Sequence, residues 1–194
     1  KTFDPYHPEP DAMTLHGDHA NVIYQIPAHA KNGSLMFLHG AGQSMRTWQT
    51  TPDGREGFQS VFLRKGYPVY LIDQPRRGDA GRATVDGTIK ASPDEQFWFG
   101  QFRMGLWPKF YDNSAFASQK DLNSFWRQMT PNTGPYNDKV IADAVTDALK
   151  KSEGTVLVTH SQGCGPGWLI GTEAGNNLKG IIAFEPGSGF IFPE

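Results

Sequence analysis

The sequence has a single cysteine, no long apolar run and no excess of positive charge. Cys164 is the only cysteine in 194 residues, so no internal disulfide can form and the redox compartment cannot be inferred from cysteines. No apolar run approaches the ~20 residues that a membrane-spanning helix needs. Eighteen basic and 20 acidic side chains give a formal net charge of −2. Nucleic-acid and anionic-membrane partners require a concentrated basic face, so we expect no nucleic-acid partner. The lack of a long apolar run leads us to expect no membrane span.

Short apolar runs predict the strands of a mostly parallel sheet. They lie at residues 22–26, 34–38, 69–72, 155–158 and 180–184. Several runs are uninterrupted rather than alternating, which is typical of strands covered by helices on both faces. Helical spacing of apolar residues predicts helices over residues 58–65 and 138–151. The sequence therefore predicts an α/β fold, in which we expect residues 22–26 to form a hairpin with the segment before Gly17.

The strongest indication of chemistry is the sequence Thr159-His160-Ser161-Gln162-Gly163 directly after a buried run. In a small-x-Ser-x-Gly turn the serine lies on a strained connection between a strand and a helix, and small residues two positions away let the two elements approach. The amides at the start of that helix can stabilise an oxyanion. We therefore predict that Ser161 is a nucleophile. The alternative is a serine that only caps a helix.

An earlier buried run ends in His39-Gly40-Ala41-Gly42. In acyl transfer of this type, one oxyanion donor is the amide after the nucleophile and the other comes from a loop after an early strand. We therefore predict that the amides of Gln162 and Ala41 form an oxyanion hole. We expect His39 to support this loop by hydrogen bonding and not to act as the general base.

Glu185 follows the run at residues 180–184 and is the candidate triad acid. A triad acid lies at the carboxyl end of a strand, in the chain order serine, acid, histidine. Of the other carboxylates after Ser161, Glu173 falls within a predicted helix and Glu194 is the last residue given. The alternative is an exposed glutamate at a strand end.

Several unusual strings are spread over the chain between residues 39 and 187. They are residues 39–40 (HG), 45–55 (MRTWQTTPDGR), 62–67 (FLRKGY), 72–74 (IDQ), 154–157 (GTVL), 160–162 (HSQ) and 185–187 (EPG). Together they resemble a small branch of α/β-hydrolase esterases of bacterial type. The resemblance implies a carboxylic-ester hydrolase, often carried to the periplasm or outside by a leader. In that branch the triad acid is a glutamate one strand earlier than in most of the fold, which is the position of Glu185.

The chain departs from this branch at two places near the expected site. The branch has a cysteine pair where this chain has Ala41-Gly42, and a serine where this chain has Gly163. The resemblance therefore implies the type of reaction more strongly than it implies the substrate. We expect an α/β-hydrolase fold over residues 1–194 as one domain, with a mostly parallel sheet, helices on both faces and truncation before the last strands.

No histidine follows Ser161, although a serine hydrolase needs an imidazole base. The six histidines are His7, His16, His19, His29, His39 and His160. We expect the His160 side chain to point away from the serine oxygen. His16 and His19 have a metal-like spacing without a third ligand, so we expect no metal and no cofactor.

The chain given stops soon after Phe190-Ile191-Phe192. We therefore expect the base and the last strands in polypeptide outside these residues, supplied either as a second chain of the same domain or by a partner.

Aromatic residues crowd the segment from residue 82 to 136. They are Phe97, Trp98, Phe99, Phe102, Trp107, Phe110, Tyr111, Phe116, Phe125 and Trp126. We interpret this segment as a cap insertion in which Trp98 and Trp107 line an apolar acyl or alcohol pocket beside Ser161. Core packing of the same aromatics is the alternative.

The predicted function is hydrolysis of a small-molecule carboxylic ester through an acyl-enzyme on Ser161. Thioester, amide or lactone cleavage would use the same residues. A binding protein on a hydrolase fold that has lost its base is the alternative of a different class, because a fold alone does not decide function.

Overall fold

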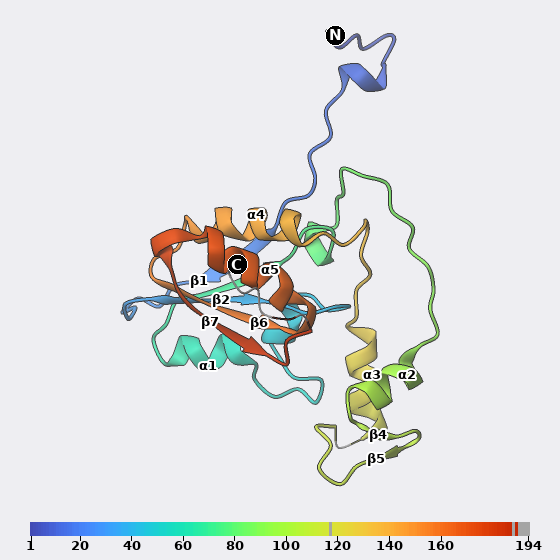
Figure 1. The fold of residues 1–194 in the computed structure, drawn as a ribbon, viewed down its shortest axis with the longest axis vertical. Coiled ribbons are helices and arrows are strands. Elements are labelled where there is room, and N and C mark those ends of the chain that lie inside the picture. Colours follow the sequence, from blue (N-terminus) through green and yellow to red (C-terminus); the bar gives the residue numbers. More distant parts are fainter. Residues whose placement is uncertain (117, 188, 190–194) are drawn as a thin grey trace.

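The computed structural model describes residues 1–116, 118–187 and 189 and has a five-stranded sheet with helices on both faces (Figure 1). The strands are β1 (Asn21–Gln25), β2 (Ser34–Leu38), β3 (Val69–Asp73), β6 (Thr155–His160) and β7 (Leu178–Phe184). Their order across the sheet is β1-β3-β2-β6-β7, and every neighbouring pair except β1 with β3 is parallel. The prediction of a mostly parallel sheet is confirmed, whereas residues 190–194, where the given chain stops, lie outside the described part.

The expected hairpin before β1 is wrong, because β1 pairs antiparallel with β3 instead. The segment that precedes β1 is bound to the loop after β3. The Asp18 amide donates to the Arg82 carbonyl at 2.9 Å, and the Asp18 carboxylate accepts Arg76 Nε at 2.7 Å. These contacts direct the segment away from β1.

Helices cover both faces of the sheet, and each face has its own apolar cluster. Helix α1 (Phe58–Arg64) lies on one face, and α4 (Asp138–Leu149) and α5 (Cys164–Glu173) lie on the other (Figure 1). All five residues of β2 and all five of β3 are buried, as expected for strands covered on both sides. The cluster on the α4 and α5 face is centred on Met36, Leu38, Tyr70, Ile72, Ile141, Val145, Leu157 and Ile170. The cluster on the α1 face is centred on Leu35, Phe37, Met45, Trp48, Val69, Leu71 and Val158.

The aromatic segment forms a small substructure beyond one end of the sheet (Figure 1). It contains α2 (Glu95–Gln101), the short strands β4 (Gly105–Leu106) and β5 (Lys109–Phe110), and α3 (Gln119–Arg127). Its apolar cluster is built on Phe99, Met104 and Leu122, with Phe110, Phe116, Phe125 and Trp126 packed around them. Some of the aromatics therefore form a local core, as the packing alternative predicted. Short 3-10 helices complete the chain at Pro10–Ala12, Met45–Trp48, Gly78–Ala80, Ser161–Gly163 and Gly175–Asn177.

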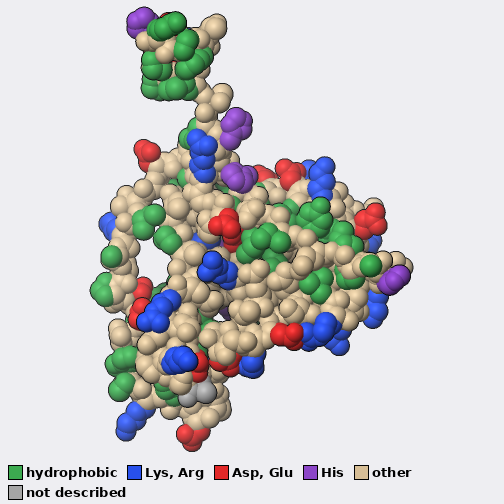
Figure 2. All heavy atoms as spheres, turned by 180° about the vertical axis from the view of Figure 1, so that it is seen from behind, with side chains coloured by type: hydrophobic (Ala, Val, Ile, Leu, Met, Phe, Trp, Pro, Cys, Tyr) green, Lys and Arg blue, Asp and Glu red, His purple; other side chains and the backbone are tan. Residues whose placement is uncertain are grey.

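The N-terminal residues form an arm that extends away from the sheet (Figures 1 and 2). Phe3 and Tyr6, near its tip, are largely exposed. On the face of the body shown in Figure 2, acidic and basic side chains are interspersed. Within the described residues, the structure contains no helix that is both long and apolar enough to cross a bilayer.

Candidate active site

Ser161 lies on a strained turn between β6 and α5. Its φ is 51°, in the left-handed region that residues with a Cβ rarely adopt. The turn is tight because Gly163 packs against the strand next to β6. A Cβ at Gly163 would lie 2.4 Å from the His39 carbonyl oxygen, so only glycine fits. The sequence-predicted strand, strained turn and helix are all present around Ser161.

The loop of residues 39–42 follows β2, the strand beside β6, and contacts the serine turn directly. A Cβ at Gly40 would lie 2.9 Å from the Ser161 Cβ. Ala41 is exposed and lines the same cavity as Ser161. In the described part of the chain, the Ala41 amide donates no hydrogen bond. The Ala41 amide is therefore available to a ligand beside Ser161.

Gln43 joins this loop to the serine turn. Its side-chain oxygen accepts the Gly40 amide at 3.0 Å and His160 Nδ1 at 2.9 Å. Because that oxygen can only accept, the neutral His160 ring carries its proton on Nδ1 and has a free lone pair on Nε2. Burial lowers the pKa of His160, which the nearby Glu185 charge partly offsets.

His160 is among the residues that line the Ser161 cavity. No hydrogen bond joins His160 to Ser161 in the described structure.

His39 is fully buried behind the loop. Its Nδ1 donates to the Gly40 carbonyl at 3.0 Å, and its Nε2 accepts the Gln74 amide at 3.4 Å. Burial lowers the pKa of His39 to about 3, so the ring is neutral at physiological pH. With both ring nitrogens facing the backbone, His39 has the supporting position that the sequence predicted.

Arg77 and the end of the aromatic segment hold the same loop from behind. Arg77 Nη1 donates to the carbonyls of Gly40 at 3.3 Å and Gln43 at 3.4 Å, and its Nε donates to Asn132 Oδ1 at 2.8 Å. The Thr130 amide donates to the Gly42 carbonyl at 2.8 Å. The loop is therefore bonded both to the sheet domain and to the returning end of the insertion.

Glu185 lies directly after β7, at the same level of the sheet as Ser161. His160 and Phe184 are register partners on the parallel strands β6 and β7, so Ser161 and Glu185 are the next residues on adjacent strands. Glu185 also has a positive φ, of 44°. The Gly187 amide donates to the Ser161 carbonyl at 3.0 Å, which binds the loop after Glu185 to the serine turn.

The Glu185 carboxylate itself pairs with Arg103 of the insertion at 2.7 Å. The side chains of the two residues are 73% and 75% exposed. Ion pairs this exposed contribute roughly 0–1 kcal/mol to stability, so Arg103 holds the Glu185 carboxylate only weakly.

A cavity of about 730 Å³ lies between the sheet domain and the insertion. Its size falls within the range of small-molecule sites. The sheet domain contributes Ala41, Gly42, Gln43, His160, Ser161 and Glu185. The insertion and the segments that flank it contribute mostly apolar groups, including Trp98, Phe102, Met104, Phe116, Phe125, Trp126 and Met129.

Of the two tryptophans predicted to line this pocket, Trp98 does so and Trp107 does not. Trp107 packs edge-on against Phe99, with 5.3 Å between the ring centroids, and is itself 48% exposed. Gln162 is not among the lining residues, but a Cβ at Gly187 would approach its amide to 3.2 Å. Because residue 187 is a glycine, no side chain at that position crowds the Gln162 amide.

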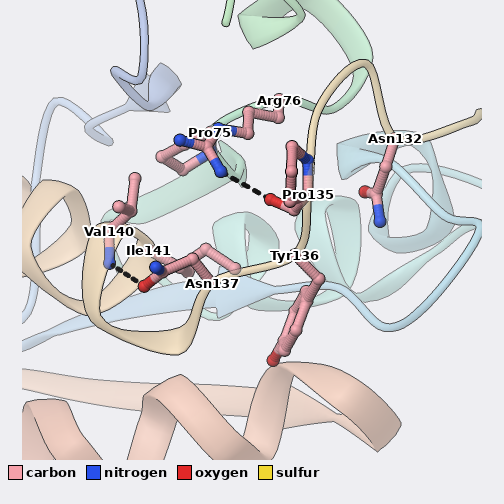
Figure 3. A pocket seen from close by; sticks show the side chains of 8 residues that line it. All are labelled: Pro75, Arg76, Asn132, Pro135, Tyr136, Asn137, Val140 and Ile141. Carbon is pink, nitrogen blue, oxygen red and sulfur yellow. Dashed lines mark hydrogen bonds between the residues drawn. The ribbon is translucent and has the colours of Figure 1, made fainter. Parts of the chain in front are cut away.

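A second, much smaller cavity lies where the insertion returns to α4 (Figure 3). Its volume is about 10 Å³, room for at most one water molecule. Arg76 Nη1 donates to the Pro135 carbonyl and the Asn137 side chain accepts the Val140 amide beside it. Tyr136 also lines this cavity, and its hydroxyl donates to the Gln162 carbonyl at 3.2 Å.

The remaining histidines lie in the first 30 residues of the chain. His7, His16, His19 and His29 are exposed residues of the N-terminal part. Among the residues the structure describes, no group of three or more His, Cys, Asp or Glu side chains could hold a metal ion.

No motif or spacing in the sequence indicated the roles of Gln43, Arg77 and Asn132. Arg77 bonds to Asn132 and to the Gln43 carbonyl across 34 or more residues of chain, and the Gln43 side chain bonds to His160 across 117. Two adjacent arginines follow β3, and nothing in the sequence separates Arg77 from Arg76.

The sheet order, the strained serine turn and the adjacent glycine loop together define an α/β-hydrolase fold. A solved structure described as a novel bacterial esterase has the same fold, with a TM-score of 0.80 and 28% sequence identity. The match covers 96% of this chain and 63% of that one.

The chain is also similar to the probable secreted lipase phiG of Fungal sp. (strain ATCC 74256). The two are 32% identical over 161 residues, which is 78% of this chain and 44% of that protein. No protein-family model matches the chain. The chain thus spans less than two thirds of the length of both relatives.

Proposed function

We propose that the protein carrying this chain is a serine carboxylic-ester hydrolase. The observation that carries the proposal is Ser161, held at a positive φ at the end of β6 and facing a cavity shared with the free amide of Ala41. Similarity to a probable lipase and to an esterase structure supports the same reaction class.

In the proposed reaction, Ser161 Oγ attacks the ester carbonyl carbon and a tetrahedral oxyanion forms. The amides of Ala41 and Gln162 donate hydrogen bonds to that oxyanion. Collapse of the intermediate breaks the bond to the alcohol oxygen, which leaves with a proton, and an acyl-enzyme remains on Ser161. Water then attacks the acyl carbon and releases the acid.

The general base is proposed to be a histidine outside these 194 residues, oriented by Glu185. His39 is unsuitable because both of its nitrogens face the backbone and its pKa is lowered to about 3. His160 makes no hydrogen bond to Ser161 in the described structure and is engaged by Gln43. Glu185 supports the assignment through its position one residue beyond the paired strand ends.

The substrate class is proposed to be an ester with an apolar acyl or alcohol group. The insertion wall of the cavity is built largely of aromatic and methionine side chains, of which Trp98 and Phe102 are in stacked contact at 5.2 Å. These aromatic and methionine side chains favour an apolar group, and the polar residues Ser92, Asp94, Glu95, Gln101 and Arg103 complete the same wall.

A fluorophosphonate probe on the full-length protein tests the nucleophile. We expect a stoichiometric adduct on Ser161, located by mass spectrometry, and none on Ser161→Ala. His160→Gln should still be labelled and should turn over ester within about tenfold of wild type, because the base lies elsewhere. An adduct on another serine, or none on the folded full-length protein, would reject the proposal. Loss of labelling in His160→Gln would move the base to His160.

A further inference from the structure

Arg77 is a buried cation without an anionic partner in contact. It is 2% exposed, and in the described structure no carboxylate forms an ion pair with it. Its neighbour Arg76 is buried too, but forms a bidentate pair with Asp18. An unpaired charge is costly to bury, so Arg77 requires an explanation that Arg76 does not.

The Arg77 guanidinium remains charged at neutral pH. Burial lowers its pKa to about 10, while Tyr136 and the Asp73 carboxylate act in the opposite direction. Its contacts are the neutral oxygens of Asn132, Gly40 and Gln43. The positive charge is therefore retained directly behind the loop that contains Ala41.

The contact with Gly40 acts on the peptide unit whose N–H belongs to Ala41. This peptide is trans, so its C=O and N–H point in opposite directions. The Gly40 oxygen accepts from Arg77 Nη1, from His39 Nδ1 and from the Gln43 amide. The Ala41 N–H therefore points away from these donors, and Ala41 itself lines the cavity with Ser161.

Donors on a carbonyl oxygen also polarise the amide of the same peptide, and a buried charge acts strongly because the surroundings are poor in water. We propose that Arg77 is a positioning residue that fixes and polarises the Gly40–Ala41 peptide for oxyanion binding. The proposal rests on the proposed function, because it assigns the stabilised oxyanion to ester hydrolysis at Ser161. Arg77 touches no substrate and acts through the backbone.

The test compares Arg77→Met, Arg77→Lys and the matched control Arg76→Met in the full-length protein. The readouts are kcat and KM for a p-nitrophenyl ester, the affinity for an alkyl boronic acid, and the affinity for a neutral alcohol of equal chain length. The boronic acid forms an anionic tetrahedral adduct on serine, whereas the alcohol requires no oxyanion site. Loss of one complete oxyanion donor costs about 10²–10³-fold in kcat.

Since the Ala41 amide would remain present but less well held, we expect Arg77→Met to lower kcat about 10–100-fold. Boronic acid affinity should fall by a similar factor, with KM and alcohol affinity within about twofold. Arg77→Lys should recover part of the loss because it keeps the charge. Arg76→Met should lower the melting temperature and leave kcat of the folded protein unchanged.

Unchanged kcat in Arg77→Met, an equal loss of alcohol and boronic acid affinity, or the same kcat loss in Arg76→Met would overturn the proposal. If Arg77→Met does not fold, Arg77→Lys and Asn132→Ala replace it in the test. Each should then lose affinity for the boronic acid and keep its affinity for the alcohol. A wild-type protein without turnover or boronic acid binding would instead reject the ester-hydrolase function itself.

Discussion

The two sides of the cavity are built in different ways. On the sheet side, Gly40, Gln43 and Ser161 lie in backbone turns fixed by hydrogen bonds and by close approaches that only glycine allows. On the insertion side, Trp98 and Phe102 of the α2 region are 37% and 43% exposed and make several ring contacts, and Trp98 Nε1 also donates to Asp94 at 3.1 Å. Hydrogen bonds impose direction, whereas ring contacts tolerate several arrangements.

This difference separates chemistry from selectivity. In the proposed ester hydrolysis, a change on the sheet side alters the positions of the reacting groups, which a reaction tolerates poorly. A change on the insertion side alters apolar contact area, whose cost is graded. We therefore expect sheet-side variants to affect kcat and insertion-side variants to affect KM and chain-length preference.

The largest effect is expected from Glu185→Gln. If Glu185 orients the catalytic imidazole, the amide favours the wrong tautomer and kcat should fall about 10³–10⁴-fold with folding preserved. Glu173→Gln is the control, because Glu173 is another carboxylate downstream of Ser161 but lies on α5 beside Lys139. Steady-state kinetics on the full-length protein measures both.

Arg103→Ala distinguishes this role from the ion pair seen here. Removing an exposed partner should cost far less than removing Glu185, because such surface pairs contribute little. Equal losses in Glu185→Gln and Arg103→Ala would show that Glu185 acts only by holding the insertion.

His39 should make the free energy of unfolding depend on pH. The ordinary pKa of histidine is about 6.5, and burial lowers that of His39 to about 3. Between these values the unfolded chain binds a proton that the folded chain excludes, so stability falls as pH drops from about 6.5 to about 3. Above pH 6.5 this contribution is constant, and across the window its upper bound is about 5 kcal/mol.

His39→Asn isolates this contribution, because the amide can still donate to the Gly40 carbonyl without titrating. Urea unfolding at pH 7.5, 6, 5 and 4 should show a shallower decline for the variant than for wild type. Parallel declines would mean that other groups, such as Asp18, account for the acid sensitivity.

The smallest effect is expected from Trp98→Ala. Loss of its contact with an apolar chain should raise KM about tenfold and shift the preferred acyl length, with kcat for short esters nearly unchanged. Trp107→Ala is the matched control: it removes a tryptophan of the same insertion that packs on Phe99 and does not line the cavity. It should lower thermal stability without changing selectivity. A similar KM shift in both variants would point to general loosening of the insertion.

The elements that the sequence predicted well are those with a local cause. Uninterrupted apolar runs identified β2 at residues 34–38, and the glycine pattern located the turn at Ser161, whose φ of 51° agrees with a strained connection. The pairing of β1 was missed because its partner β3 is distant in the sequence and no local pattern marks that pairing.

The supporting residues of the site could not be predicted for the same reason. Gln43, Arg77 and Asn132 acquire their roles only when distant loops meet, and no spacing or composition marks them. Trp107 was assigned to the pocket because aromatic density predicts burial but not which way a ring faces. The parallel register of β6 and β7 places Ser161 and Glu185 side by side, directly after the two strand ends. The sequence only suggested this arrangement.

The hydrogen bonds that Thr130 donates and Asn132 accepts have a consequence for exchanging the aromatic segment between related proteins. They make the returning end of the insertion a structural part of the glycine loop, since Thr130 binds the Gly42 carbonyl and Asn132 binds Arg77. A chimera with its second crossover before residue 130 would keep these bonds and import only a new pocket wall. One with its crossover at α4 would replace both residues and would leave the loop of residues 39–42 without these two contacts.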